Sequence, residues 1–139
     1  MSQVRLTRGQ PGASGNICWG IRALTENRRG LCDALQKGAY AQQALAPVFS
    51  WLDNQPPAPP RIWAFGAGGQ VKLHCKPAAS EPVWRWLVQT RSAGAWITEI
   101  VPGSTSERVF LFSNKPDAIA VAAIDRCGNA SEPAVLERQ

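Results

Sequence analysis

The stretch A118IAVAAIDRCGNASEPA134 decides the fold of this chain. Its first part, residues 118–124, is an unbroken apolar run, and it ends at the turn-forming residues 125–129. A second short apolar run, Val135 and Leu136, follows. Apolar runs of about four to eight residues between Gly, Asn, Asp and Pro are typical of buried strands that enter a hairpin. The stretch therefore predicts a buried strand, a tight turn and a last strand.

The same rhythm extends upstream as far as a proline-rich run, residues 56–60, where four of five residues are proline. Such a run favours an extended connector and excludes a helix, so it predicts a domain boundary. The strands expected beyond it, with the two above included, are 61–65, 70–76, 83–90, 95–101, 108–112, 118–124 and 135–136. Seven short strands with turns about every ten residues predict a mainly β, seven-stranded antiparallel sandwich of two sheets.

The front third follows a different pattern. Residues 1–13 are polar and contain glycine and proline, which predicts a flexible leader. Residues 17–21 are apolar enough for a buried strand, and Asn27 is placed to cap a helix that follows it. A lone strand leaves backbone groups unpaired, which is unfavourable when they are buried. We therefore expect residues 14–55 to be a strand–helix part of something larger, followed by the sandwich over residues 56–139.

The chain is basic, with a net charge of +5, but the charge is spread out. Residues 1–55 hold six Lys and Arg against three Asp and Glu, and residues 56–139 hold nine against seven. A nucleic-acid surface needs a clustered basic stripe, so no nucleic-acid partner is expected. No apolar run approaches the length that spans a bilayer, so membrane insertion is not expected either, and a monomer is predicted.

Neither the cysteines nor the single histidine predict a metal site or a cofactor. The four cysteines show no short metal-binding spacing such as C-x-x-C. His74 and Cys75 are neighbours in an expected strand, where adjacent side chains point to opposite faces. His74 is therefore interpreted as a structural residue, and no catalytic constellation accompanies it.

Two cysteines raise the alternative of a disulfide. In a sandwich of this topology the loops that follow the second and sixth strands lie at the same end. Cys75 stands near the end of the second strand, and Cys127 stands just beyond the sixth. A bridge between Cys75 and Cys127 is one hypothesis, and two unpaired thiols are the other.

The six tryptophans are open to two interpretations. Trp84 and Trp86 share a strand face with Val88, and this spacing predicts packing in the core. Trp63 and Trp96 lie in the expected strands 61–65 and 95–101, and either of them is a candidate for exposure at a sheet edge, as a platform on which a sugar ring stacks. A contiguous exposed aromatic patch would favour the ligand platform over core packing.

The turn Asp125-Arg126-Cys127-Gly128-Asn129, followed by Ser131 and Pro133, resembles a fibronectin type III-like domain of the kind found in bacterial proteins. The resemblance covers roughly residues 57–137 and includes the proline-rich entry and the strand number. It implies an immunoglobulin-like sandwich in which Asp125, Arg126 and Asn129 form a turn rather than a site.

The front piece resembles a second family. The matching positions are Gly15, Asn16, Ile17, Ala23, Leu24, Asn27, Gly30, Leu31, Asp33, Ala34, Leu35, Tyr40, Ala44, Leu45, Pro47, Trp51 and Leu52. They resemble the end of the bacterial family-10-like, lipoprotein-associated glycosyl hydrolases, which have a (β/α)8 barrel and a trailing β-sandwich. The resemblance implies that residues 17–21 correspond to the eighth barrel strand and residues 28–37 to the last barrel helix. It also implies a parent protein outside the cytoplasm or in the cell envelope.

These resemblances imply a chain without catalytic activity of its own. Barrel active sites combine loops from several strands, and most glycosidases use two carboxylates around one bond. The front piece offers one strand and the acids Glu26, Asp33 and Asp53. The predicted function is an accessory module that packs against or spaces the catalytic barrel, its expected partner. The alternative is an autonomous carbohydrate- or protein-binding sandwich with Trp63 and Trp96 on its working surface.

Overall fold

The computed structural model describes residues 2–13, 15–17, 20–67, 70–78, 80, 82–105, 107–111 and 116–137. Backbone contacts divide the chain into two compact units, residues 1–42 and 43–139. The sequence predicted a domain boundary at the proline run, residues 56–60. The observed boundary lies upstream of that run, because residues 43–55 hydrogen-bond to the sandwich. None of the helices in the described part of the chain is both long and apolar enough to cross a bilayer.

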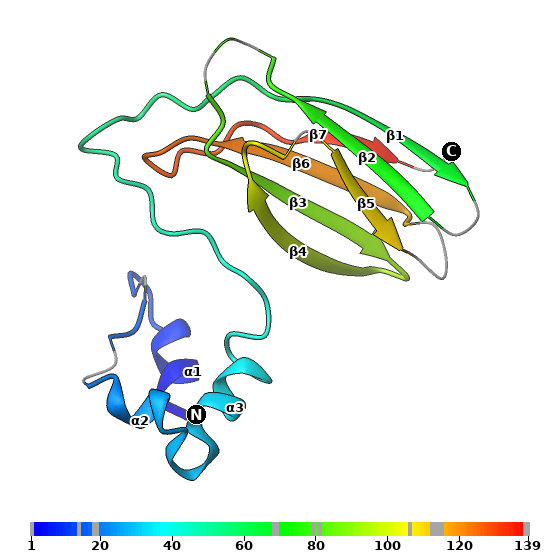
Figure 1. Cartoon of the computed structure of the whole chain (residues 1–139). Coiled ribbons are helices and arrows are strands. Elements are labelled where there is room, and N and C mark those ends of the chain that lie inside the picture. The colour runs from blue at the N-terminus through cyan, green and yellow to red at the C-terminus, as the bar shows by residue number, and fades with distance from the viewer. Residues whose placement is uncertain are drawn as a thin grey trace. The chain divides into compact units, whose positions relative to one another are not determined.

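The second unit is a sandwich of two antiparallel sheets that face each other (Figure 1). Its strands are β1 (Arg61–Ala67), β2 (Gln70–Lys76), β3 (Arg85–Ser92), β4 (Ala95–Pro102), β5 (Glu107–Leu111), β6 (Ala118–Ile124) and β7 (Ala134–Glu137). One sheet has the strand order β1-β2-β5, and the other has the order β4-β3-β6-β7. The mainly β, two-sheet antiparallel architecture predicted from the strand spacing is confirmed.

Alternation along the strands builds the core. On β2, Val71, Leu73 and Cys75 are buried while the residues between them are partly or fully exposed. Trp86 and Val88 of β3 enter the same core from the opposite sheet. Because successive side chains of a strand point to opposite faces, this pattern assigns one face of each sheet to the core and the other to solvent.

β6 is the exception, because all of its residues are buried. It lies between β3 and β7, with Ile119 and Val121 in the core. The positions that alternate with these, Ala118, Ala120 and Ala122, are small and are also buried. The continuous apolar run 118–124 is therefore a buried strand, as predicted and with the predicted bounds, and it occupies a central position in its sheet.

The first unit is helical. Its elements are α1 (Ser2–Arg8), α2 (Arg22–Thr25), the 3-10 turn η1 (Arg28–Gly30) and α3 (Leu31–Gln36). The prediction of a flexible leader is wrong, because most of that segment forms α1. The helix ends at Arg8, and the next N–H, that of Gly9, donates to the Arg5 carbonyl oxygen. The expected barrel strand is also not seen: Ile17, Gly20 and Ile21 are outside any strand, and Cys18 and Trp19 lie outside the described residues. Since no strand of this unit is described beside them, these residues have no ladder to join.

Asn27 was predicted to cap a helix from about Arg28, but the N-cap residue of α3 is Gly30, and the Asn27 side chain instead bonds to the first turn of α3 from a position before η1. The Asn27 Oδ1 accepts the backbone N–H of Cys32 at 2.9 Å, and its Nδ2 donates to the Asp33 carboxylate at 2.9 Å. These bonds satisfy one donor of the first helical turn. The backbone of Asn27 is left-handed (φ 45°), a conformation that asparagine tolerates better than most residues.

Candidate functional site

The outer face of the β1-β2-β5 sheet carries an aromatic and basic cluster. Ile62 and Ala64 of β1 pack against the core, so Arg61, Trp63 and Phe65 project to the outside. Strand register places the Arg61–Lys76, Trp63–His74 and Phe65–Lys72 pairs side by side on this surface. We call these six residues the aromatic–basic face.

The rings of this face are in mutual contact. The Trp63 and His74 ring centroids lie 5.2 Å apart, with an angle of 1° between the planes, so the rings are stacked. Phe65 meets His74 edge to face, at 6.0 Å and 77°. Trp63 remains 40% exposed and Phe65 remains 64% exposed. The result is an ordered aromatic surface that is open to solvent.

A cavity of about 420 Å³ adjoins this face at the β1 edge of the sandwich. Trp63 and Phe65 contribute to its lining, together with Ile119 of β6 and Leu136 of β7. Glu137 of β7 also lines it, so the aromatic–basic face continues into a recess of mixed polar and apolar character.

Trp96, the other predicted platform residue, lies on the opposite sheet. It is 42% exposed on β4, and the Arg91 guanidinium carbon lies 5.5 Å from its ring centroid. Trp63 and Trp96 therefore do not form one patch. Each is exposed as the platform interpretation requires, and Trp63 stacks on His74, whose ring also meets the exposed Phe65.

Trp84 corrects the prediction for its strand. β3 begins at Arg85 rather than Val83. Trp84 therefore precedes the strand and does not follow its alternation of buried and exposed side chains. Its ring is 43% exposed and lies under the Arg85 guanidinium, 4.4 Å from the centroid, while Trp86 is buried as predicted. The shared core face was therefore right for Trp86 and Val88 and wrong for Trp84.

The proposed disulfide is not formed, because Cys75 and Cys127 are both free thiols. The Cys75 side chain belongs to the buried core of β2, whereas Cys127 sits in the turn after β6 and is outside that core cluster. Burial raises the pKa of the Cys75 thiol to about 11. Removal from water, and then the charges of Asp125 and Asp53, raise the pKa of the Cys127 thiol as well. Both thiols are poor nucleophiles at neutral pH.

The raised pKa of Cys75 makes stability depend on alkaline pH. The unfolded thiol ionises near its ordinary pKa of 9.0, while the folded thiol ionises at about 11. The stabilisation is therefore complete below pH 9 and is lost as the pH rises from 9 to 11. Urea unfolding at pH 8 and pH 10.5 should show a smaller alkaline loss for Cys75→Ala than for the native chain. Equal losses in the two proteins would contradict the assignment.

The turn after β6 binds residues 43–55, which lead into the sandwich and which we call the connector. The Asp125 carboxylate accepts the Asn129 backbone N–H at 2.9 Å and its Nδ2 at 2.8 Å. The same Nδ2 donates to the Asp53 carbonyl oxygen at 3.2 Å, and the Phe49 N–H donates to the Cys127 carbonyl oxygen at 2.8 Å. We call residues 125–129 the connector socket.

A glycine makes this approach possible. Gly128 has a left-handed backbone (φ +87°), and a Cβ there would lie 3.3 Å from the Pro47 carbonyl oxygen and from the Val48 Cα. Farther along the connector, the Ile100 N–H donates to Gln43 Oε1 at 2.7 Å. Sequence reasoning assigned these turn residues to turn chemistry alone, because nothing in the sequence marks a partner some 76 positions away.

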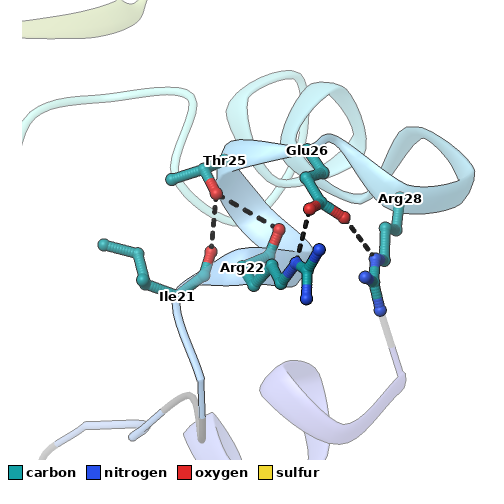
Figure 2. A network of polar contacts seen from close by, with 5 residues as sticks. All are labelled: Ile21, Arg22, Thr25, Glu26 and Arg28. Carbon is teal, nitrogen blue, oxygen red and sulfur yellow. Dashed lines mark hydrogen bonds and ion pairs between the residues drawn. The ribbon is translucent and has the colours of Figure 1, made fainter.

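Glu26, one of the three acids of the front piece, belongs to a surface ion-pair network (Figure 2). Its carboxylate accepts from Arg22 Nε at 2.6 Å and from Arg28 Nε at 2.7 Å. The two guanidinium groups lower the pKa of Glu26. All three side chains are well exposed, and such pairs stabilise folds only weakly. Within the described ranges, His, Cys, Asp and Glu side chains form no group of three able to hold a metal ion.

Comparisons with known proteins identify the fold of the second unit. No protein-family model and no curated protein matches the chain. Among solved structures, the fn3 domain of the human collagen alpha-1(XX) chain is 17% identical and has a TM-score of 0.52, covering 62% of this chain and 87% of that one. A crystal structure of the FN3 domain of human collagen XX is also 17% identical, with a TM-score of 0.46, and covers 68% and 100%. The Clostridium perfringens spore cortex lytic enzyme SleM matches at 17% identity with a TM-score of 0.45, over 60% of this chain and 29% of that one. The sheet order and the first of these similarities show that the second unit has a fibronectin type III-like fold.

Proposed function

We propose that this chain is a non-catalytic accessory module of a glycosyl hydrolase outside the cytoplasm or in the cell envelope. In this proposal the first unit is the end of the catalytic barrel, and the seven-stranded, immunoglobulin-like sandwich spaces the barrel or packs against it. The binding of the connector to the sandwich is the observation that carries the proposal. The connector socket bonds to Phe49 and Asp53, so the connector is attached to the sandwich at these two residues and is not a free tether. A spacer benefits from such an attachment, whereas a loose tether does not need it.

The surface of the first unit supports the same proposal. None of the described residues in this unit is buried, and Ile17 is 97% exposed. Leu6 and Ile21 are also largely exposed. A unit of this size without a buried core has little to offset the entropy of ordering its chain. Apolar side chains of this kind are suited to packing on the missing part of a barrel.

Expression of the longer reading frame tests this function. The chain alone and the chain with the gene sequence upstream of it are each incubated with bacterial cell-wall glycans and soluble polysaccharides. We expect reducing ends to be released only by the longer protein, and the first unit to become resistant to protease within it. Hydrolysis by the chain alone would overturn the proposal, and so would an upstream sequence too short for a barrel.

The connector attachment has its own prediction. Asn129→Ala removes the two bonds that Asn129 Nδ2 donates, to the Asp53 carbonyl oxygen and to the Asp125 carboxylate, and keeps the backbone N–H bond to Asp125. It should lower the free energy of unfolding by about 1–3 kcal/mol. It should also increase protease cleavage within residues 43–55, which we would locate by mass spectrometry. Asn54→Ala is the matched control, because among the described residues the Asn54 side chain bonds to its neighbour rather than to the socket: the Gln55 Nε2 donates to Asn54 Oδ1 at 3.3 Å. Equal cleavage in the two variants would contradict the socket.

A second candidate function is an autonomous carbohydrate- or protein-binding module. The observation that favours it is the aromatic–basic face, where Trp63, Phe65 and His74 form an exposed and ordered surface. Exposed aromatic patches on soluble domains often mark interaction sites. Binding that survives removal of residues 1–42 and is lost on Trp63→Ala would favour this function, whereas the accessory role requires no ligand.

A further inference from the structure

We infer that the aromatic–basic face binds an acidic polysaccharide, with sugar rings on Trp63 and Phe65 and their carboxylates beside the flanking cations. The inference rests on the second candidate function and names its ligand class. All residues of the aromatic–basic face belong to β1 and β2 of the sandwich.

The charge of the face selects an anion. Residues 61–76, which form β1, β2 and the hairpin between them, contain no Asp or Glu and contain Arg61, Lys72 and Lys76. These three cations occupy outward-facing positions of the two strands and lie on the same surface as the exposed rings. The β5 position in register with His74 is an acid, Glu107. The surface is therefore positive although the charge of the whole chain is dispersed.

The spacing places a cation beside each ring. Phe65 is directly opposite Lys72, and Arg61 is directly opposite Lys76, so each pair is about 5 Å apart at Cβ. Trp63 follows Arg61 by two positions on the same strand, a separation of about 7 Å. A uronic acid carries its carboxylate at the edge of a ring whose faces are largely apolar. Stacking on Trp63 or Phe65 thus brings that carboxylate toward an ammonium or guanidinium group.

The stack with His74 prepares the site before a ligand arrives. Parallel contact with the His74 ring covers one side of Trp63 and holds the indole in one orientation. Less side-chain freedom is then lost on binding, which favours affinity. The adjoining recess is lined by Leu136, Ile119 and Glu137, so it suits an uncharged part of a longer glycan chain rather than a second carboxylate.

Other classes of ligand fit this face less well. A nucleic acid requires phosphate contacts along an extended basic stripe, and this face offers cations on two short strands only. A neutral glycan would use the rings but would gain nothing from the charges of Arg61, Lys72 and Lys76. An acidic peptide would use the cations and leave Trp63 and Phe65 without one.

The test uses the full chain and four probes: polygalacturonate, neutral dextran, polyglutamate and a single-stranded oligonucleotide. Affinity electrophoresis and calorimetry at 50 and 300 mM NaCl should show polygalacturonate binding that weakens with salt, and markedly weaker binding of the other three. Trp63→Ala should reduce polygalacturonate affinity about tenfold or more, and Lys72→Ala about three- to tenfold. Phe65→Ala, at a more exposed ring, provides a second variant if Trp63→Ala fails to fold.

Trp96→Ala is the matched control, because Trp96 is exposed to nearly the same extent, 42% against 40%, on the opposite sheet. Its affinity for polygalacturonate should be unchanged. An equal loss in Trp63→Ala and Trp96→Ala would overturn the location. Equal binding of dextran, polyglutamate or the oligonucleotide would overturn the ligand class. If dextran binding were itself lost on Trp63→Ala, the second candidate function would stand while this inference failed; absence of binding to either glycan would overturn the inference.

Discussion

Trp86→Ala is expected to lower the free energy of unfolding by about 3–5 kcal/mol. Trp86 is 1% exposed and is the largest of the fully buried side chains. It stands on β3 between Val101 of β4 and Ala123 of β6, and both neighbours belong to the same core cluster. Removal of the indole leaves a cavity that these backbone-anchored strands cannot close. Since domains of this size are stable by only about 5–15 kcal/mol, the loss is a large share of the total.

Trp86→Phe separates packing from hydrogen bonding at the same position. Within the part of the chain that the structure describes, the buried Trp86 Nε1–H has no hydrogen-bond partner. Phenylalanine leaves a smaller cavity than alanine and removes a donor whose burial without a partner costs about 1–3 kcal/mol. The loss on Trp86→Phe should therefore be about 1 kcal/mol or less.

Both variants are measured by urea unfolding of the full chain, followed by circular dichroism in the β region. The midpoint should move much further for Trp86→Ala than for Trp86→Phe, with similar slopes. Equal losses would show that the indole N–H contributes a bond to the fold, and would contradict the assignment of the effect to packing.

The sandwich was readable from the sequence because its strands carry two simple patterns. Val71, Leu73 and Cys75 alternate with polar residues, which reports a strand with one face in the core. Residues 118–124 are apolar throughout, which reports a strand covered on both sides. Neither pattern depends on a distant residue, and both strands were predicted with their observed bounds.

The features that the sequence missed depend on contacts between distant segments. The connector socket pairs Asn129 with Asp53, and neither residue alone indicates the other. Trp84 was assigned to the core because its spacing from Trp86 fits a strand, but β3 begins one residue later. Cys75 and Cys127 were candidates for a bridge because the topology brings loops to one end, and topology does not determine where each thiol points.

The first unit was misread for a different reason. Ile17 and Ile21 have the apolar character of a buried strand, but a strand forms only where a neighbour supplies hydrogen bonds. Within the described residues of this unit the backbone bonds are local and helical, as in α1. The prediction for Asn27 was partly right: its side chain accepts the N–H of Cys32 in the first turn of α3, which is a local interaction, but the N-cap residue itself is Gly30.

Gly103→Ala is expected to lower the free energy of unfolding by about 3 kcal/mol or more. Gly103 follows β4, and its N–H donates to the Trp84 carbonyl oxygen at 2.8 Å. A Cβ at this position would overlap the Val83 carbonyl group and would lie 2.9 Å from the Trp84 carbonyl carbon. All of these atoms are main-chain atoms, so no side-chain rotation relieves the overlap. Accommodation requires the segment that enters β3 to move away from the end of β4.

Gly94→Ala is the matched control for Gly103→Ala. Gly94 lies in the turn between β3 and β4 with a left-handed backbone (φ +79°), and no atom lies within 4 Å of a Cβ built there. Alanine at Gly94 is therefore strained by its backbone alone, at about 1–2 kcal/mol. Thermal unfolding of both variants should place Gly103→Ala clearly below Gly94→Ala. The reverse order would mean that the chain on either side of Gly103 yields easily, and that the close approach of Val83 and Trp84 to the end of β4 contributes little to holding the β3–β4 edge together.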